Sequence, residues 1–312
     1  MQQKALTTEQ VRALIARGKF RDTMFQALGI VFLAIGLAVI LLLVGDMVMR
    51  GAERLSLDFF TNFASRRPTQ AGILSAWVGS LLVMTVTAFA AVPLGVAAGV
   101  YLEEYAKRNW ITEIIEINIT NLAAVPSIVY GLLALGIFVY QFGFGQSILS
   151  AGLTLALLIL PIIIVSTREA IRAIPAMIRE GSMAVGATRW QTCRYHIIPY
   201  AMPGILTGVI IGLARAIGET APIITIGALT FIAFLPPVPF TDMGEGVRAG
   251  MFDWLTSPFT VMPIQIFNWT SRPDPAFEVN AAAAGFVLMV MVLSMNAVAI
   301  WLRYRMRKNI KW

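Results

Sequence analysis

Cysteine and histidine are almost absent from this chain of 312 residues, which contains one of each, Cys193 and His196. A single cysteine excludes a disulfide within the chain and a metal cluster built on cysteine. One histidine leaves little for a histidine-based metal site or a catalytic triad. The Walker A pattern GxxxxGK[ST] is missing as well, so the chain cannot bind ATP by that motif. We expect no catalytic residue, no metal and no cofactor.

Charged residues are also scarce, at 13% of the chain against roughly 25% in soluble domains. Hydrophobic residues make up 58%, and the mean hydropathy is +0.76. This composition predicts an integral membrane protein. The formal net charge of +7 raises the question of a nucleic-acid partner. The basic residues instead fall in particular loops, where they set membrane topology, and we expect no nucleic acid to bind.

Six apolar stretches predict six transmembrane helices, over residues 25–44, 76–101, 122–140, 148–165, 200–234 and 281–302. The first is longer than the roughly 7–15 residues of a signal-peptide core, and it ends in Gly45-Asp46-Met47 rather than in a small-residue cleavage site. We therefore interpret it as a retained span. The predicted organisation is an N-terminal segment over 1–23, a first helix over 24–48, a core over 73–304 and a basic tail over 305–312.

The positive-inside rule orients these spans. With the N-terminus in the cytoplasm, 17 of the 24 Lys and Arg residues fall inside and 6 outside, while Arg215 lies within a span. The distribution predicts a multi-pass membrane protein with both termini cytoplasmic, a cytoplasmic loop over 168–199 and an outer loop over 235–280. Trp254 and Trp269 of the outer loop are expected at the membrane interface, as part of an aromatic belt.

The fifth span carries two charges near its middle, Arg215 and Glu219, which are four residues apart and so share one helical face. A charge at the membrane centre costs about 2.5–3.5 kcal/mol on insertion scales. An i,i+4 ion pair on an exposed helix returns only about 0.2–0.5 kcal/mol. A polar pathway, or a partner subunit with its own charges, explains this pair better than pairing alone. The alternative is a structural pair buried between helices.

Pro222 predicts that this span is broken. A proline inside a helix removes a donor and clashes with the carbonyl four residues back, which belongs to Gly218. The span from 200 to 234 would also be about 52 Å long as one helix, against a hydrocarbon core of about 30 Å. A break across 218–222 places a new helix start beside Thr220, and helix starts attract anions. Arg215, Glu219 and Thr220 are therefore the predicted pathway residues for an anion.

The loop over 168–199 is the second candidate site. Glycine and proline positions predict a short helix, a glycine turn and a second helix that leads back to the membrane. Its small residues leave a slim surface that a partner groove can accept, and its charged residues can set the orientation of docking. An ordinary charged cytoplasmic loop is the alternative. The predicted docking residues are Arg179, Glu180, Gly181, Ser182, Gly186, Ala187 and Arg189.

The spacing of this loop resembles the EAA loop of ABC-importer permeases. In that motif Glu-Ala-Ala is followed after three residues by Gly, and after nine more by Ile-x-Leu-Pro. The anchors in register here are Glu180, Gly186 and Pro199. The departures are Gly181 and Ser182 for Ala, His196 for Ile, and Ile198 for Leu.

The stretch GLARAIGETAP over residues 212–222 narrows the resemblance to the permeases of phosphate-specific importers. Three further stretches are similar to the PstA type rather than to its PstC partner: GVYLEEY at 99–105, VPSIVYGL at 125–132 and FTVMPIQIFNW at 259–269. The resemblance covers the chain from about residue 22 onward. It implies an all-α, type I ABC-importer permease (MetI-like) fold with six transmembrane helices, in a bacterial inner membrane.

The resemblance also implies partners and roles. Such a permease is half of a translocation pathway and pairs with a homologous PstC-type subunit. Two copies of a cytoplasmic PstB-type ATPase bind below, at the coupling helix of the EAA loop, and a periplasmic PstS-type phosphate-binding protein docks above. The Arg and Glu of the signature, here Arg215 and Glu219, are implicated in the passage of inorganic phosphate. Membrane lipid surrounds the assembly, and ATP hydrolysis takes place on the partner chain.

A purely structural or assembly membrane subunit is disfavoured by the charged pair in the fifth span. Two other functions remain open from the sequence. One is a permease of the same architecture for another oxyanion, such as sulfate or molybdate. The other is a stand-alone secondary anion transporter, which would need no docking loop and usually shows internal symmetry. A requirement for a separate ATPase distinguishes the importer subunits from the secondary transporter.

Overall fold

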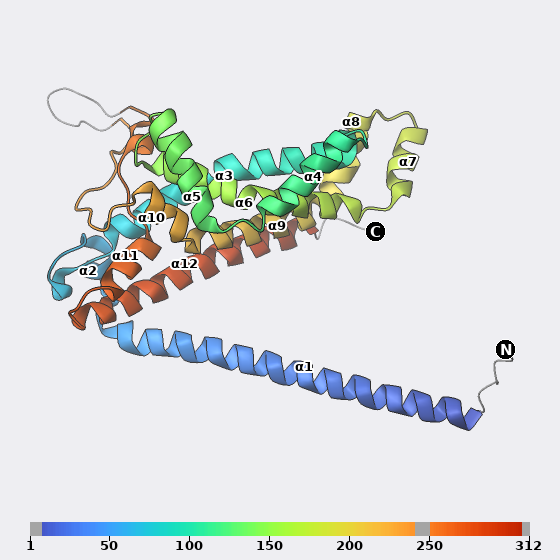
Figure 1. The fold of residues 1–312 in the computed structure, drawn as a ribbon, viewed down its shortest axis with the longest axis horizontal. Helices are drawn as coiled ribbons and strands as arrows, with labels where there is room; N and C mark the ends of the chain where they lie inside the picture. Colours follow the sequence, from blue (N-terminus) through green and yellow to red (C-terminus); the bar gives the residue numbers. More distant parts are fainter. Residues whose placement is uncertain (1–7, 241–249, 308–312) are drawn as a thin grey trace.

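The computed structural model describes residues 8–240 and 250–307, which form helices joined by turns, with no β-strand among them (Figure 1). The α-helices are α1 (Thr8–Gly51), α2 (Leu57–Thr61), α3 (Leu74–Val100), α4 (Trp110–Leu122), α5 (Ser127–Ala134), α6 (Ile148–Arg172), α7 (Ala176–Ala184), α8 (Arg189–Thr192), α9 (Ile198–Gly218), α10 (Ala221–Ile226), α11 (Met262–Thr270) and α12 (Ala276–Arg307). The π-helical turns are η3 (Tyr101–Tyr105), η4 (Leu135–Gln141) and η5 (Cys193–Ile197). The 3-10 turns are η1 (Ala52–Arg54), η2 (Pro68–Gln70) and η6 (Asp253–Thr256).

Five helical runs in the described part of the chain are long and apolar enough to cross a membrane: Gly18–Arg54, Leu74–Tyr105, Ile148–Arg172, Arg189–Gly218 and Ala276–Met306. A sixth span results if α4 and α5 are counted together, although they are bent by 107° relative to each other. Pro126 lies at this bend and disfavours a helical conformation in the residue before it. The all-α fold class expected from the sequence is confirmed, and the helices around the predicted third span are bent instead of forming one straight helix.

The core of the molecule forms where α3, α6 and α9 pack against one another. Ile159, Ile163 and Ile205 are at most 2% exposed. Glycines bring α3 and α6 close: a Cβ added to Gly99 would lie 2.6 Å from Thr167, and one added to Gly152 would lie 2.5 Å from Val86. Small residues at such crossings are typical of helices that associate in a membrane, where close packing replaces the hydrophobic effect.

The helix α1 lies apart from this core (Figure 1). Its most apolar 18-residue window has no buried residue, although it has the highest hydropathy of the candidate spans. Contact with the rest of the chain occurs at its C-terminal end, where Gly51 meets the backbone of Ala283 and Met47 lies over Gly285. Because its most apolar stretch has no cover among the described residues, lipid or another protein must cover it.

The outer loop predicted over 235–280 contains more structure than expected. It includes α11 and the start of α12, and Met262, Ile264 and Trp269 of α11 are at most 1% exposed. Trp269 lies between the rings of Phe59 and Phe277, at centroid distances of 6.0 and 6.4 Å. The placement of Trp269 at the membrane interface was therefore wrong, because a side chain of this size stabilises the core around α2, α11 and α12.

The molecule has two distinct ends. The helices α7 and α8 lie at one end, together with the N-terminal end of α1 and the C-terminal end of α12 (Figure 1). The helices α2, α10 and α11 lie at the other (Figure 1). The two candidate sites of the sequence are divided between these ends.

Candidate functional site

The helix break predicted across 218–222 is present. The helix α9 ends at Gly218, and Glu219 follows with extended backbone angles of −75° and 127°. The helix α10 then begins at Ala221 with Pro222 in its first turn, where the missing N–H of proline leaves no hydrogen bond unmade. Gly227 ends α10 with a positive φ of 96°. The proline therefore starts a new helix instead of kinking the old one.

Arg215 and Glu219 come together at this break. Nε of Arg215 donates to Oε1 of Glu219 over 3.1 Å, and the two side chains are 40% and 18% exposed. A guanidinium carries five N–H donors. Within the described part of the chain, Nε is the one donor of Arg215 that is engaged. The remaining four point to no partner there and are available to an external acceptor.

Thr220 and the surrounding space add little to the site within this chain. Thr220 stands at the N-cap of α10, but its side chain makes no capping hydrogen bond, and α10 is only six residues long. Glu219 lines a void of about 10 Å³ with Ser80 and Ala216. Such a void holds about one water molecule at most. The exposed side of Arg215 therefore faces outward from this chain, and any anion-sized pathway needs a second surface to close it.

The loop over 168–199 folds as the sequence predicted, with α7, a turn and α8. Gly186 makes the turn with a φ of 92°, in the left-handed region that glycine tolerates. Thr188 and Gln191 form a capping box at the start of α8. One correction concerns the start of the loop, because α6 continues to Arg172 and the first residues of the loop are helical.

The predicted docking residues divide into two groups. Glu180, Gly181 and Arg189 are exposed, and the neighbouring apolar side chains Met177 and Val185 are 80% and 87% exposed. Arg179 and Ser182 instead turn inward. Ser182 lies 2.9 Å from Thr192 of α8, hydroxyl to hydroxyl, and Arg179 binds Glu104 at the end of α3. The outward group can meet a partner, whereas the inward group holds α7 in place.

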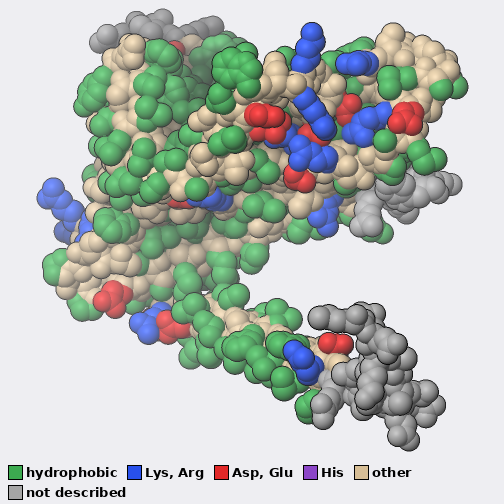
Figure 2. All heavy atoms as spheres, turned by 45° about the vertical axis from the view of Figure 1, so that its right-hand side comes forward, with side chains coloured by type: hydrophobic (Ala, Val, Ile, Leu, Met, Phe, Trp, Pro, Cys, Tyr) green, Lys and Arg blue, Asp and Glu red, His purple; other side chains and the backbone are tan. Residues whose placement is uncertain are grey.

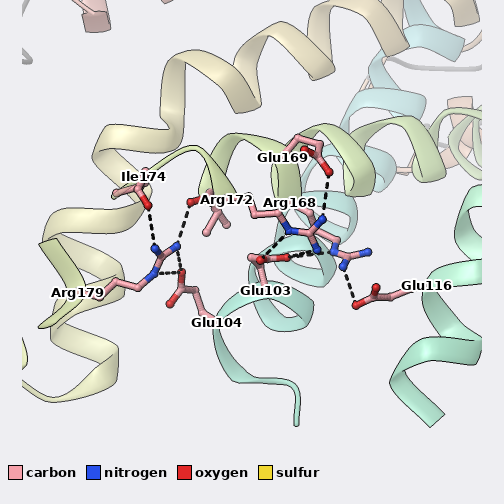
Figure 3. Close-up of polar contacts among 9 residues, drawn as sticks. Glu103, Glu104, Glu116, Arg168, Glu169, Arg172, Ile174 and Arg179 are labelled. Carbon is pink, nitrogen blue, oxygen red and sulfur yellow. Dashed lines mark hydrogen bonds and ion pairs between the residues drawn. The ribbon is translucent and has the colours of Figure 1, made fainter. Parts of the chain in front are cut away.

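Charged side chains gather at the α7 end of the molecule, and many of them pair with one another (Figures 2 and 3). Nη2 of Arg168 lies 2.6 Å from Glu116, and its Nε lies 3.4 Å from Glu103. Arg172 donates twice to Glu103, over 3.0 Å each. The side chain of Arg168 is only 9% exposed. This network joins α3, α4, α6 and α7.

Sequence reasoning missed this network. The signal was present in the adjacent acids Glu103 and Glu104 of the GVYLEEY stretch, which served only as evidence of resemblance. Arg168 and Arg172 were used only as positive charges that orient the spans in the membrane. The pairs between helices connect residues 52 to 75 positions apart, and a sequence pattern does not indicate such partners.

One continuous helical run connects the two candidate sites. The elements α8, η5 and α9 follow each other without interruption from Arg189 to Gly218. Arg215 lies 26 residues beyond Arg189. The distance along the run is about 39 Å, at about 1.5 Å per residue. A displacement of α8 therefore reaches Arg215 through a single secondary-structure element.

The comparisons with known proteins agree with this architecture. Residues 91–311 match the family model described as "Binding-protein-dependent transport system inner membrane component". The probable ABC transporter permease protein YqgI of Bacillus subtilis is 31% identical over 280 residues, which cover 89% of this chain and 93% of that protein.

A second relative is the phosphate transport system permease protein PstA 1 of Mycobacterium tuberculosis. It is 31% identical over 233 residues, which cover 75% of this chain and 71% of that protein. Among solved structures, a bacterial ABC transporter involved in the import of the acidic polysaccharide alginate superposes with a TM-score of 0.59 at 14% identity. The match covers 95% of this chain and 98% of that one, and at this identity it shows the fold alone.

Proposed function

The chain belongs to the family of binding-protein-dependent transport system inner membrane components, and from this we propose that it is the PstA-type permease subunit of an ATP-driven phosphate importer. The observation that carries the proposal is the pair at the break of α9. Arg215 has N–H donors without an acceptor among the described residues. The carboxylate of Glu219, 3.1 Å away, partly offsets the positive charge of Arg215. A transit site needs enough cationic character to admit an anion and too little to retain it.

The substrate follows from this chemistry and from the relatives. A guanidinium offers parallel N–H donors that fit two oxygens of a phosphate at once. The phosphate transport permease of Mycobacterium tuberculosis is among the relatives at 31% identity. Inorganic phosphate is therefore the proposed substrate, and Arg215, Glu219 and Thr220 are the residues proposed to line its path at the break between Gly218 and Pro222.

A second permease subunit of the PstC type is the proposed partner within the membrane. The exposed span of α1 supports this, since its apolar surface has no cover within the described chain. The open side of Arg215 supports it as well, because the void that Glu219 lines within the described chain is only about 10 Å³. A further cation from the partner would balance the divalent charge that phosphate mostly carries near neutral pH.

ATP hydrolysis is proposed to occur on two copies of a PstB-type ATPase bound at α7 and α8. The exposed tip formed by Met177, Glu180, Gly181, Val185 and Arg189 is the proposed contact. This places the α7 end in the cytoplasm, together with both chain termini, and the opposite end toward a PstS-type phosphate-binding protein in the periplasm. The positive-inside distribution supports the same orientation in a bacterial inner membrane.

The test is phosphate uptake by proteoliposomes that contain the whole assembly, with ATP hydrolysis measured in the same samples. Arg215→Gln should reduce uptake by roughly tenfold or more, because a charged hydrogen-bond donor to the substrate is lost. Hydrolysis and assembly should persist. The matched control is Arg50→Gln, which breaks another i,i+4 ion pair, with Asp46 at 2.8 Å. Unchanged uptake by Arg215→Gln would show that Arg215 only packs, and that phosphate passes elsewhere.

Another oxyanion is the second candidate substrate, because the donors of Arg215 also fit sulfate or molybdate. Uptake of labelled phosphate in the presence of excess sulfate or molybdate distinguishes the candidates. Competition by either anion at concentrations comparable to phosphate would transfer the assignment to that anion. The secondary transporter considered from the sequence is set aside, since the matched family consists of components of binding-protein-dependent systems.

A further inference from the structure

Two adjacent glutamates at the end of α3 serve different partners. Glu103 accepts from Arg168 and Arg172, which both belong to α6. Glu104 accepts from Arg179, which belongs to α7 (Figure 3). Both glutamates lie in the π-helical turn η3, and neither side chain is more than 15% exposed. The end of α3 is therefore tied both to the core and to the helix that protrudes from it.

Arg179 engages four of the five N–H donors of its guanidinium. Nε and Nη2 donate to Oε1 of Glu104 over 2.9 and 2.8 Å. Nη1 donates to the carbonyl of Ile174, and Nη2 also donates to the carbonyl of Ile171, over 3.0 Å each. The carbonyls at a helix C-terminus lack partners within the helix, so Arg179 also caps the end of α6. One side chain thus connects α7 with the ends of α3 and α6.

The contact between α7 and the rest of the chain depends on few groups. Among the described residues, its polar side-chain links are those of Arg179 and the contact between Ser182 and Thr192. A cavity of about 210 Å³ lies beside these links, lined by Glu104, Tyr105, Arg179, Met183, Arg189 and Thr192. The apolar side chain of Ile178 also packs against the core, so these two links are the polar contacts through which movements of α7 can reach the rest of the described chain.

The turns at both anchor points are π-helical. Glu104 lies in η3, which follows α3, and Thr192 directly precedes η5, which leads into α9. Single π-turns inside helices occur frequently at functional sites. They mark positions where a helix changes its hydrogen-bond pattern. Each link of α7 therefore lies in, or directly before, a turn at which the hydrogen-bond pattern of a helix changes.

We propose that the Glu104–Arg179 ion pair is the joint that transmits movement of α7 to the membrane helices. The proposal rests on the proposed function, in which α7 receives the movements of an ATPase. Glu104 and Arg179 are positioning residues, and neither is assigned a contact with substrate. The joint acts on α3 directly, while the contact between Ser182 and Thr192 acts on α9.

The test compares variants of the complete assembly in proteoliposomes and measures the phosphate transported per ATP hydrolysed. Arg179→Met should lower this ratio by roughly fivefold or more, the lower end of usual coupling between sites, while hydrolysis persists. Arg179→Lys keeps the positive charge but lacks the planar set of N–H donors of a guanidinium. Its ratio of phosphate transported to ATP hydrolysed should lie between those of the wild type and Arg179→Met. Arg108→Met is the matched control, because Arg108 is exposed near the same turn and forms no ion pair with the described residues.

A double-mutant cycle covers the case in which one variant assembles poorly. In Glu104→Gln with Arg179→Gln no charge is left unpaired, and the ratio should be no lower than in either single variant. Additive losses would mean that the residues act independently, and an unchanged ratio in Arg179→Met would mean that α7 is coupled by other contacts. Either result would contradict the proposal that the Glu104–Arg179 ion pair transmits the movement of α7.

A second readout does not depend on phosphate. With Cys193→Ser as the background, a single thiol is introduced by Leu94→Cys on α3, the helix on which the joint acts directly, where Leu94 is 63% exposed. Labelling by a thiol reagent should change when ATP and vanadate trap the ATPase, and this change should disappear with Arg179→Met. If the change in labelling persists in Arg179→Met, the proposed role of the Glu104–Arg179 ion pair is rejected. Wild-type assemblies that fail to take up phosphate but retain the change would reject only the proposed substrate.

Discussion

The charged residues of this protein form two regions that differ in how completely they are paired. At the α7 end, the donors of Arg168, Arg172 and Arg179 are directed at acidic side chains and backbone carbonyls. At the break of α9, Arg215 makes one bond to Glu219, and its side chain is 40% exposed. Cations with several contacts stabilise an arrangement of helices, whereas a cation with a single contact keeps most of its donors for another acceptor. The comparison separates charges that hold helices from a charge that is available to an anion.

The largest effect is expected from Arg168→Met. The substitution leaves Glu103 without one of its two arginines and Glu116 without its partner, in a region where Arg168 is 9% exposed. Breaking a buried ion pair from one side destabilises a protein by about 3–5 kcal/mol. We expect poor recovery of folded protein and a lower melting temperature in detergent. Arg172→Met is the control, since Arg172 is 51% exposed and exposed pairs contribute about 1 kcal/mol at most. Equal losses in both variants would contradict the distinction between the two arginines.

Reversal of the charge at the helix break should reduce uptake while leaving the stability of the protein nearly unchanged, in contrast to Arg168→Met. Arg215→Glu places two carboxylates four residues apart and faces an incoming anion with a like charge, which costs several kcal/mol and should reduce uptake by roughly 100-fold or more. The melting temperature of the purified subunit should change little, because the pair is partly exposed and makes a single bond. Uptake and melting temperature are measured on the same preparation. A large loss of stability with uptake retained would place Arg215 among the structural charges.

The contact between α7 and α8 provides a smaller effect. Ser182→Ala removes a buried hydroxyl and leaves that of Thr192 without its partner at 2.9 Å. The loss should amount to about 1 kcal/mol of stability, with a small decrease in the melting temperature. Thr192→Val should give a similar decrease, and the double variant should lose less than the sum. Additive decreases would show that the two hydroxyls do not depend on each other.

The smallest effect is expected at the neighbouring position. Gly181 lies within α7, and a Cβ added there would meet nothing within 4 Å. Gly181→Ala should therefore stabilise α7 by about 0.5–1 kcal/mol, because alanine has the higher helix propensity. Uptake should change little, because a single methyl group is a small addition to the exposed surface that is proposed to contact the ATPase. The melting temperature measures the first effect, and the affinity of the ATPase for the assembly measures the second.

Local features of the fold were predictable from the sequence. The apolar runs predicted the membrane helices. Pro222 predicted the break at Gly218, and Gly186 predicted the turn between α7 and α8. Each of these depends on residues within one or two helical turns. The pair of Arg215 and Glu219 was predictable for the same reason, since residues four apart share a helical face.

Features that depend on distant residues were not predictable in this way. The pair of Glu104 and Arg179 joins positions 75 apart, and nothing in either segment specifies the other. The same limit explains the wrong placement of Trp269, whose surroundings come from α2 and α12. Arg179 was predicted to face a partner, but its geometry within the chain leaves its donors occupied. The local sequence gives the charge of a residue, while its direction depends on tertiary packing.

The isolation of α1 has a consequence for how the protein is made. Lipid chains are about as apolar as leucine, so a helix covered only by lipid is not destabilised as it would be in water. A newly inserted subunit can therefore remain intact in the bilayer before its partner is synthesised, with α1 attached near Gly51 and Ala283. The order in which the two subunits are synthesised should then matter little, because finished subunits can meet by lateral diffusion in the bilayer.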